Sequence, residues 1–316
     1  MPTKPPTLPL DVKFSVCCIL PTLNSGKEIQ KCLDALMKQL FHFDVFVVDS
    51  SSDDDTVDQV RRYLKDFITI RRSEFNHGGT RQMMVERLSG YDIYLFLTQD
   101  AILEDNRAIE KLVLPFMDPD IGCAYGRQLP HFDATPLARH ARHFNYPELS
   151  HVRSLEDGRT LGLKAAFISN SFAAYRAKAL QDIGGFPEKV ILSEDMYVAA
   201  SMLLKGWRVA YAADATCRHS HNYRLLEEFS RYFDIGVFHS EESWLKSAFG
   251  GVEGEGVKFV VSELKFLGVR RLYLWPRSLV ANVIKYIGFF FGKHEKWLPR
   301  WFKEKISMNK KYWHYD

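Results

Sequence analysis

Short apolar runs of β type alternate with amphipathic helical patterns along the N-terminal part of the chain, and this order allows few folds. Strands are predicted at residues 12–20, ended by Pro21, and at 45–48, 68–70 and 93–97. After Ser25 and Gly26, apolar residues recur at helical spacing as far as Leu40. Because two parallel strands need a long crossover, usually a helix, the order predicts a mostly parallel, Rossmann-like α/β sheet flanked by helices.

The rest of the chain is less regular. A loop at 76–79 precedes a helix near 81–88, further strands are predicted at 121–127, 163–169 and 209–211, and helices at 177–183 and 194–204. The pattern is helical from about Leu225 onward. A composition with 46% hydrophobic residues supplies enough apolar side chains for a sizeable core. We expect an N-terminal extension at 1–12, an α/β domain at 13–224 and a helical segment at 225–316.

Polar side chains follow three of the predicted strands. Thr22 and Asn24 follow the first, Asp49 with residues 50–55 follows the second, and residues 98–100 end the fourth. In open parallel sheets, ligands bind beyond the carboxyl ends of the strands, where loops and helix N-termini meet. These clusters therefore predict one nucleotide-type site. The alternative is that Asp49 and the acids at 53–55 serve only as turn and helix-cap residues.

Several short motifs resemble one enzyme family. ILPTLN at 19–24 and VVDSSSDDDT at 47–56 resemble the opening of family 2 glycosyltransferases, and TQD at 98–100, GGFPE at 184–188 and SED at 193–195 follow in the family's order. The resemblance covers roughly 13–224. It implies the GT-A fold, a nucleotide-binding mixed sheet flanked by helices, here with a basic helical appendage. It also implies sugar transfer from a nucleotide-diphosphate sugar.

Three further motifs narrow the resemblance. FNHGGTR at 75–81, HSHNY at 219–223 and RYFDIG at 231–236 are similar to bacterial rhamnosyltransferases that use dTDP-L-rhamnose. The resemblance places the following residues at the donor nucleotide: Pro21, Thr22, Asn24, Asp49, Asn76, His77, Gly78, Arg81 and Gln99. Among these, Asp49 would accept a hydrogen bond from the pyrimidine and Arg81 would contact phosphate. The alternative for the two glycines at 78 and 79 is an ordinary turn.

The resemblance also implies a divalent cation, Mg²⁺ or Mn²⁺, that stabilises the leaving diphosphate. Asp100 would hold it, with His219 and His221 as candidate ligands. The chain departs from the family at two positions, since Ser50 replaces a frequent second acid and Thr98 occupies the first position of the Asp-x-Asp motif. The alternative for each histidine is a surface or satisfied buried side chain.

Asp195 is the predicted catalytic residue. In an inverting transfer, a carboxylate takes the proton of the acceptor hydroxyl as its oxygen attacks the anomeric carbon. The resemblance gives this role to Asp195 and places Glu194 and Asn170 on the acceptor side. The alternative is that both acids only begin a helix.

The end of the chain is strongly basic. Residues 265–316 contain 12 Lys and Arg against three Asp and Glu, a net +9, so the rest carries −6 of the total +3. A helical apolar stripe, Trp297 and Trp301 accompany this charge. The pattern fits a helix on an anionic membrane, or a helix packed on the catalytic domain with a solvated basic face. Nucleic-acid binding is disfavoured because no recognition module accompanies the charge.

Three observations suggest where such a protein works. The first ten residues lack a signal-peptide pattern, no apolar run approaches the roughly 18 to 20 residues of a membrane span, and the five cysteines lack paired spacing. We expect a cytoplasmic protein, peripheral at the inner face of the membrane, with a polyprenyl-diphosphate-linked glycan as acceptor.

Two alternative functions stay open. One is a family 2 transferase with another donor, such as a UDP-hexose. The other is an inactive nucleotide-sugar-binding membrane scaffold, suggested by Ser50 and Thr98 but opposed by retention of Asp100 and Asp195. A nucleotidyltransferase is disfavoured because residues 21–26 lack a Gly-rich basic loop.

Overall fold

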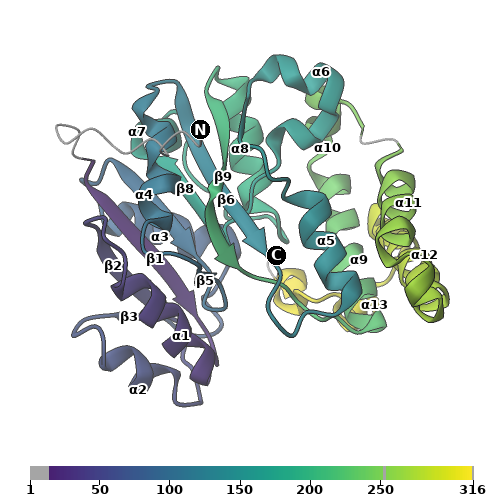
Figure 1. Cartoon of the computed structure of the whole chain (residues 1–316), viewed down its shortest axis with the longest axis horizontal. Helices are drawn as coiled ribbons and strands as arrows, with labels where there is room; N and C mark the ends of the chain where they lie inside the picture. The colour runs from purple at the N-terminus through teal and green to yellow at the C-terminus, as the bar shows by residue number, and fades with distance from the viewer. Residues whose placement is uncertain (1–13, 252–253, 315–316) are drawn as a thin grey trace.

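The computed structural model describes residues 14–251 and 254–314 (Figure 1). The predicted extension at 1–12 and the first two residues of the predicted strand 12–20 lie outside the described residues. Within them, the chain forms one mixed sheet flanked by helices, followed by C-terminal helices. This confirms the predicted α/β fold class.

In the described part of the chain, the sheet has nine strands in the order β3-β2-β1-β4-β8-β6-β9-β5, with β7 paired to β9. The strands are β1 (Val16–Thr22), β2 (Asp44–Asp49), β3 (Ile68–Thr69), β4 (Ile93–Leu97), β5 (Ile102–Leu103), β6 (Ile121–Leu129), β7 (His151–Arg153), β8 (Phe172–Arg176) and β9 (Arg208–Arg218). The first four are mutually parallel, as predicted, whereas β8 runs antiparallel to both β4 and β6. The reversal at β8 makes the sheet mixed.

Helices cover both faces of the sheet. They are α1 (Gly26–Met37), α2 (Thr56–Arg61), α3 (His77–Arg87), α4 (Ala108–Val113), α5 (Pro136–Asn145), α6 (Gly158–Leu161), α7 (Ala177–Asp182), α8 (Glu194–Leu204), α9 (Leu225–Glu241), α10 (Ser243–Phe249), α11 (Glu255–Leu267), α12 (Trp275–Lys293) and α13 (Arg300–Ile306). Alternate residues of β1 enter different cores: Cys17 and Ile19 belong to one, Cys18 and Leu20 to the other. Burial on both faces explains why β1 is a continuous apolar run.

Two predicted strand assignments are wrong. Residues 163–169 do not form a strand, because Gly162–Ala166 is a 3₁₀ helix and the strand β8 begins only at Phe172. Leu163, Ala165 and Ala166 are buried there, and a short buried apolar run has no period that separates strand from helix. Pro21 does not end the first strand, since it pairs with Val48 and β1 continues to Thr22. The fixed φ of proline is compatible with extended backbone.

Two helix boundaries also differ from the prediction. The first helix ends at Met37 rather than Leu40, whose N–H instead donates to the carbonyl of Asn106 at 2.8 Å. The predicted loop at 76–79 is largely the first turn of α3. The Asn76 side chain caps that turn by accepting from the Gly79 N–H at 2.8 Å.

Helices α9 and α12 are in backbone contact. A Cβ added at Gly292 would lie 2.0 Å from the Phe233 carbonyl oxygen, and one added at Gly236 would lie 2.3 Å from that of Phe289. The chain then returns to α9, where Asp234 accepts hydrogen bonds from the N–H groups of Met308 and Asn309, each at 3.0 Å. The C-terminal helices therefore pack on the rest of the fold. Within the described residues, no helix has the length and apolarity to cross a bilayer.

Candidate active site

A cavity of about 730 Å³ lies at the carboxyl ends of β1 and β4. The predicted site residues that line it are Pro21, Thr22, His77, Arg81, Gln99, Asp100, Asp195, His219 and His221. The predicted residues outside its lining are Asn24, Asp49, Asn76, Gly78, Glu194 and Asn170. The three polar strand ends therefore meet at one cavity through Thr22, Ser50 and Asp100, as the strand-end argument predicts, but six predicted site residues are not part of its lining.

Asp49 holds the loops that shape the cavity. Its carboxylate accepts from Thr22 Oγ1 at 2.9 Å, from the Ser52 N–H at 2.9 Å and from Ser52 Oγ at 2.6 Å. Asn24 Oδ1 accepts from the Asp53 N–H at 2.8 Å. Gln99, in the turn after β4, also binds the loop after β1: its side chain accepts from the Leu23 N–H and donates to the Leu23 carbonyl. These bonds fix the loop after β1 to the loops after β2 and β4.

Gly78 permits close packing behind the cavity. A Cβ at this position would lie 1.7 Å from the Pro187 carbonyl oxygen, so only glycine lets α3 approach that loop. Asn76 caps α3 from the same side. Both residues thus have a structural task that explains their presence, and neither faces the cavity.

Non-glycine residues with positive φ gather around the cavity. They are Asn24, Ser51 and Ser193, with φ of 46°, 57° and 60°. Such conformations are strained for residues with a Cβ and concentrate at functional sites. Ser193 lies in the lining and immediately precedes α8, so the strain is two residues from Asp195, the predicted catalytic residue.

Arg81 and Glu194 form a buried ion pair. Arg81 Nη1 lies 2.9 Å from Glu194 Oε1, and the two side chains are 6% and 7% exposed. Asn170 Nδ2 donates to the same Oε1 at 2.8 Å. Burial would raise the pKa of Glu194, but the charges of Arg81 and His77 and the bond from Asn170 prevail and hold it below its usual value. Glu194 is therefore an anion.

Asp195 has a different environment. Its carboxylate accepts from the N–H groups of Asn170 at 3.0 Å and Met196 at 2.8 Å, and it lines the cavity. Burial, followed by the negative charge of Glu194, raises the pKa of Asp195 to about 7. A carboxylate with a pKa near neutrality can exchange a proton with a bound hydroxyl at physiological pH.

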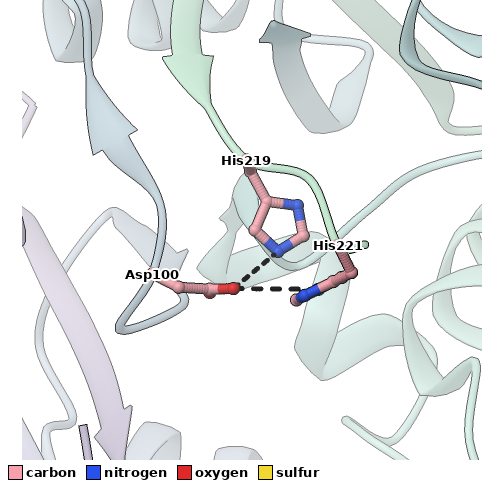
Figure 2. A group of neighbouring side chains, drawn as sticks. All are labelled: Asp100, His219 and His221. Carbon is pink, nitrogen blue, oxygen red and sulfur yellow. Dashed lines mark ion pairs between the residues drawn. The ribbon is translucent and has the colours of Figure 1, made fainter. Parts of the chain in front are cut away.

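Asp100, His219 and His221 form a group that could hold a metal ion. Figure 2 shows one Asp100 oxygen facing a ring nitrogen of each histidine; Asp100 Oδ2 lies 3.3 Å from His219 Nε2 and 3.7 Å from His221 Nε2. One potential ligand atom from each of the three residues lies within 4.8 Å of the others. Asp100 comes from the turn after β4, and the histidines come from the segment after β9.

The surroundings of His219 fit a metal ligand. Gln128 Oε1 accepts a hydrogen bond from Arg142, and it lies 3.0 Å from His219 Nδ1. Because that oxygen can only accept, Nδ1 carries the ring proton, which leaves the lone pair of Nε2 directed toward Asp100. A lone pair beside a carboxylate oxygen favours a cation between them. Ser171 Oγ, at 3.4 Å, is the other neighbour of Nε2.

Sequence reasoning missed part of the cavity wall. Arg142 of α5 lines it, and so do Arg231, Ile235 and His239, which are spaced four residues apart on α9. The start of α5 had a signal, because Thr135 caps the helix and Pro136 opens it. The face of α9 also had a signal, because the RYFDIG motif at 231–236 contains Arg231 and Ile235, but the sequence analysis assigned the segment from Leu225 to an appendage. That segment contributes directly to the wall.

Comparison with known proteins agrees with this architecture. The family described as glycosyl transferase family 2 matches residues 17–184. The chain is 47% identical over 303 residues to the O-antigen chain rhamnosyltransferase RfbN of Salmonella typhimurium, covering 95% of this chain and 96% of that protein. It is 44% identical over 301 residues to the O-antigen chain rhamnosyltransferase WbaN of Salmonella anatum, covering 95% and 96%.

Solved structures show the same fold at low sequence identity. The mannosyltransferase PcManGT of Pyrobaculum calidifontis, in complex with GDP-Man and Mn²⁺, superposes with a TM-score of 0.61 at 17% identity over 90% of this chain and 91% of that one. TarS residues 1–349 of S. aureus give a TM-score of 0.51 at 17% identity over 89% and 91%. These likenesses concern the fold.

Proposed function

Because the chain belongs to glycosyltransferase family 2, we propose that it transfers L-rhamnose from dTDP-L-rhamnose to a polyprenyl-diphosphate-linked glycan. The names of the two Salmonella relatives support rhamnose as the sugar. The observation that carries the chemistry is that Asp195, a carboxylate of raised pKa, and the group of Asp100, His219 and His221 line the same cavity.

Asp195 acts as the general base in this proposal. The acceptor hydroxyl gives its proton to the Asp195 carboxylate while its oxygen forms a bond to the anomeric carbon. The bond from that carbon to the donor diphosphate breaks, and the nucleoside diphosphate leaves with the electron pair. Attack from the face opposite the leaving group inverts the anomeric centre. The N–H groups of Asn170 and Met196 hold the carboxylate in position for this transfer.

Asp100, His219 and His221 would hold the divalent cation. When bound, Mg²⁺ or Mn²⁺ supplies positive charge that stabilises the departing diphosphate. A set of one carboxylate and two imidazoles favours Mn²⁺ over Mg²⁺, which prefers oxygen ligands alone. Mn²⁺ in the PcManGT complex is consistent with this choice.

The donor nucleotide would lie against the loops after β1 and β4. Pro21, Thr22 and Gln99 provide that wall, and Asp49 keeps Thr22 in place while remaining our candidate for the pyrimidine contact. Arg81 borders the phosphate end, although its Nη1 is occupied by Glu194 and His77. Glu194 and Asn170 therefore act on the acceptor side through Asp195 and Arg81 rather than by direct contact.

We assign catalysis jointly to residues 13–224 and to α9 of the segment 225–316. The outer helices of that segment would lie on the cytoplasmic face of an anionic membrane. Members of their apolar stripe are solvent-exposed, with Leu279 at 45%, Val280 at 48% and Val283 at 57%. Trp297 and Trp301, at 70% and 67%, accompany the lysines nearby.

A donor panel tests the proposal. Purified protein is titrated calorimetrically with dTDP-L-rhamnose, UDP-glucose and GDP-mannose, with and without Mn²⁺, and transfer to a short lipid-linked diphosphate acceptor is measured for each. The expected result is Mn²⁺-assisted binding and transfer for dTDP-L-rhamnose only. Transfer from UDP-glucose instead would establish the alternative donor class, and binding without any transfer would establish the scaffold.

A further inference from the structure

A second cavity of about 200 Å³ adjoins the catalytic cavity between α5, α9, α11 and α12. Both cavities are lined by Arg142, Asn145, His221, Arg231 and Ile235. The two cavities therefore adjoin at five shared side chains, and the second extends from this junction toward the C-terminal helices. Figure 1 places α11 and α12 at the end of the molecule opposite β2 and β3.

Two arginines at this junction have no carboxylate partner. Among the described residues, neither Arg142 nor Arg231 forms an ion pair: Arg142 donates to Gln128 Oε1, and Glu228, whose charge acts on Arg231, is paired with Lys285. The Nε of Arg142 is buried and has no hydrogen-bond partner there, while the Arg231 guanidinium lies over the Tyr223 ring at 5.4 Å. Partly buried guanidinium groups without an anion are costly unless a ligand supplies the negative charge. Their position favours a phosphate-bearing ligand.

The outer part of the second cavity is amphipathic. Arg277, Ala281 and Lys285 face it from successive turns of α12, and Phe259 and Leu274 add apolar surface. Its one lining carboxylate, Glu228, pairs with Lys285 at 3.4 Å. The charge of the lining is therefore positive. The same helix also carries the exposed apolar side chains of Val280 and Val283, which lie outside the lining.

We propose that this second cavity binds an amphiphilic phosphate or diphosphate ester, with its anionic group at Arg142 and Arg231 and its apolar chain directed toward α12. The inference rests on the proposed function, because it identifies this ligand with the lipid-linked end of the acceptor. The order of groups across the two adjoining cavities supports that identification. The reacting sugar would lie near Asp195, the phosphate at the arginine pair and the chain at the membrane-facing helix.

Calorimetry with farnesyl diphosphate tests the site without requiring sugar transfer. The protein is first saturated with dTDP and Mn²⁺ so that the donor position is filled. One equivalent of farnesyl diphosphate should then bind. Inorganic pyrophosphate, which lacks the apolar chain, and farnesol, which lacks the anionic group, should each bind at least about tenfold more weakly. Arg277→Glu should weaken the binding about tenfold or more, because it replaces a positive charge in the lining of the second cavity with a negative one.

Two comparisons control this experiment. Arg270→Glu makes the same charge change at an exposed residue outside both cavities and should bind farnesyl diphosphate like the unaltered protein. Ala281→Leu, which adds a larger side chain to the lining of the second cavity, should also weaken binding of farnesyl diphosphate. Competition between dTDP and farnesyl diphosphate, equal effects of Arg277→Glu and Arg270→Glu, or equally tight pyrophosphate would each overturn the assignment. A wrong donor leaves this binding intact and is detected separately by the donor panel.

Discussion

Arg81 Nη1 lies 2.9 Å from Glu194 Oε1 in a buried ion pair. Glu194 is the first residue of α8, and Asp195 directly follows it. The pair explains how two adjacent acids acquire opposite behaviour. Arg81 keeps Glu194 ionised, and the negative charge of Glu194 adds to burial in raising the pKa of Asp195 to about 7. One residue is thereby fixed as a charge and the other is free to accept a proton.

The first prediction concerns the pH dependence of transfer. Asp195 must be deprotonated to act as base, so kcat/KM should fall as pH decreases through about 7, the pKa to which burial and Glu194 raise this carboxyl. Asp195→Asn should lose about 100- to 10,000-fold in turnover while its affinity for dTDP changes little. Rate measurements from pH 5 to 9, with calorimetry as the binding control, check both parts. Near-normal turnover of the variant would contradict the assignment.

The second prediction separates Glu194 from Asp195. Glu194→Gln removes the neighbouring negative charge, so the pKa of Asp195 should fall and the acid limb of the rate profile should move to lower pH. Glutamine still offers an oxygen to Arg81 and Asn170, so the variant should fold. Tyr94→Phe is a matched control, because it removes a buried polar atom outside the cavity lining and should leave the limb in place. An unmoved limb in Glu194→Gln would exclude the electrostatic coupling.

The third prediction concerns the cation. Asp100→Asn and His219→Gln should abolish the gain in dTDP affinity that Mn²⁺ provides, because each removes one member of the three-residue group. Binding without Mn²⁺ should change little. His294→Gln is the control, since His294 is only half-buried and lies outside both cavities. A full Mn²⁺ effect in both site variants would show that the cation binds elsewhere.

Local patterns were enough to predict the N-terminal half of the fold. β1, β2 and β4 are runs buried on both faces, and the polar residues that follow them had to meet because the strands are parallel. The same reasoning failed at 163–169, where three buried apolar residues form a 3₁₀ turn. Burial alone does not distinguish a strand from a helix over so few residues.

The site was predictable in part. Thr22, Gln99 and Asp100 lie where strand ends converge, but Asn76 was assigned to the nucleotide although its side chain caps α3. The proximity of Asp100 to His219 depends on the pairing of β5 with β9, which connects distant segments and leaves no local signal. Likewise, the Arg231 face of α9 reaches the cavity through tertiary packing.

The fourth prediction concerns the contact between α9 and α12. Gly292→Ala would bring a methyl group to 2.0 Å from the Phe233 carbonyl oxygen, so the helices must separate. The free energy of unfolding should fall by about 1–3 kcal/mol, and transfer should weaken because α9 carries part of the cavity wall. Gly256→Ala has open space around its Cβ and should be neutral or stabilising by up to about 1 kcal/mol. Denaturant unfolding of both variants provides the comparison.

The last prediction concerns the membrane. Because α12 packs on α9, removing the C-terminal helices would disturb the cavity, and surface substitutions are the sharper test. Trp297→Ser with Trp301→Ser removes two exposed aromatic side chains beside the basic residues and should weaken binding to vesicles containing anionic lipid.

Salt and a matched control complete that test. Each basic residue near an anionic surface contributes about 1 kcal/mol that salt screens, so binding by the unaltered protein should fall between low and moderate ionic strength. Leu149→Ser removes an apolar side chain that is 80% exposed but lies outside the C-terminal helices, and it should bind vesicles normally. Transfer to a short water-soluble acceptor should be retained by the tryptophan variant, whereas transfer to a vesicle-embedded acceptor should decline with its vesicle binding. Equal co-sedimentation of all three proteins with vesicles would show that the basic helices serve only in packing. It would contradict the proposed membrane location.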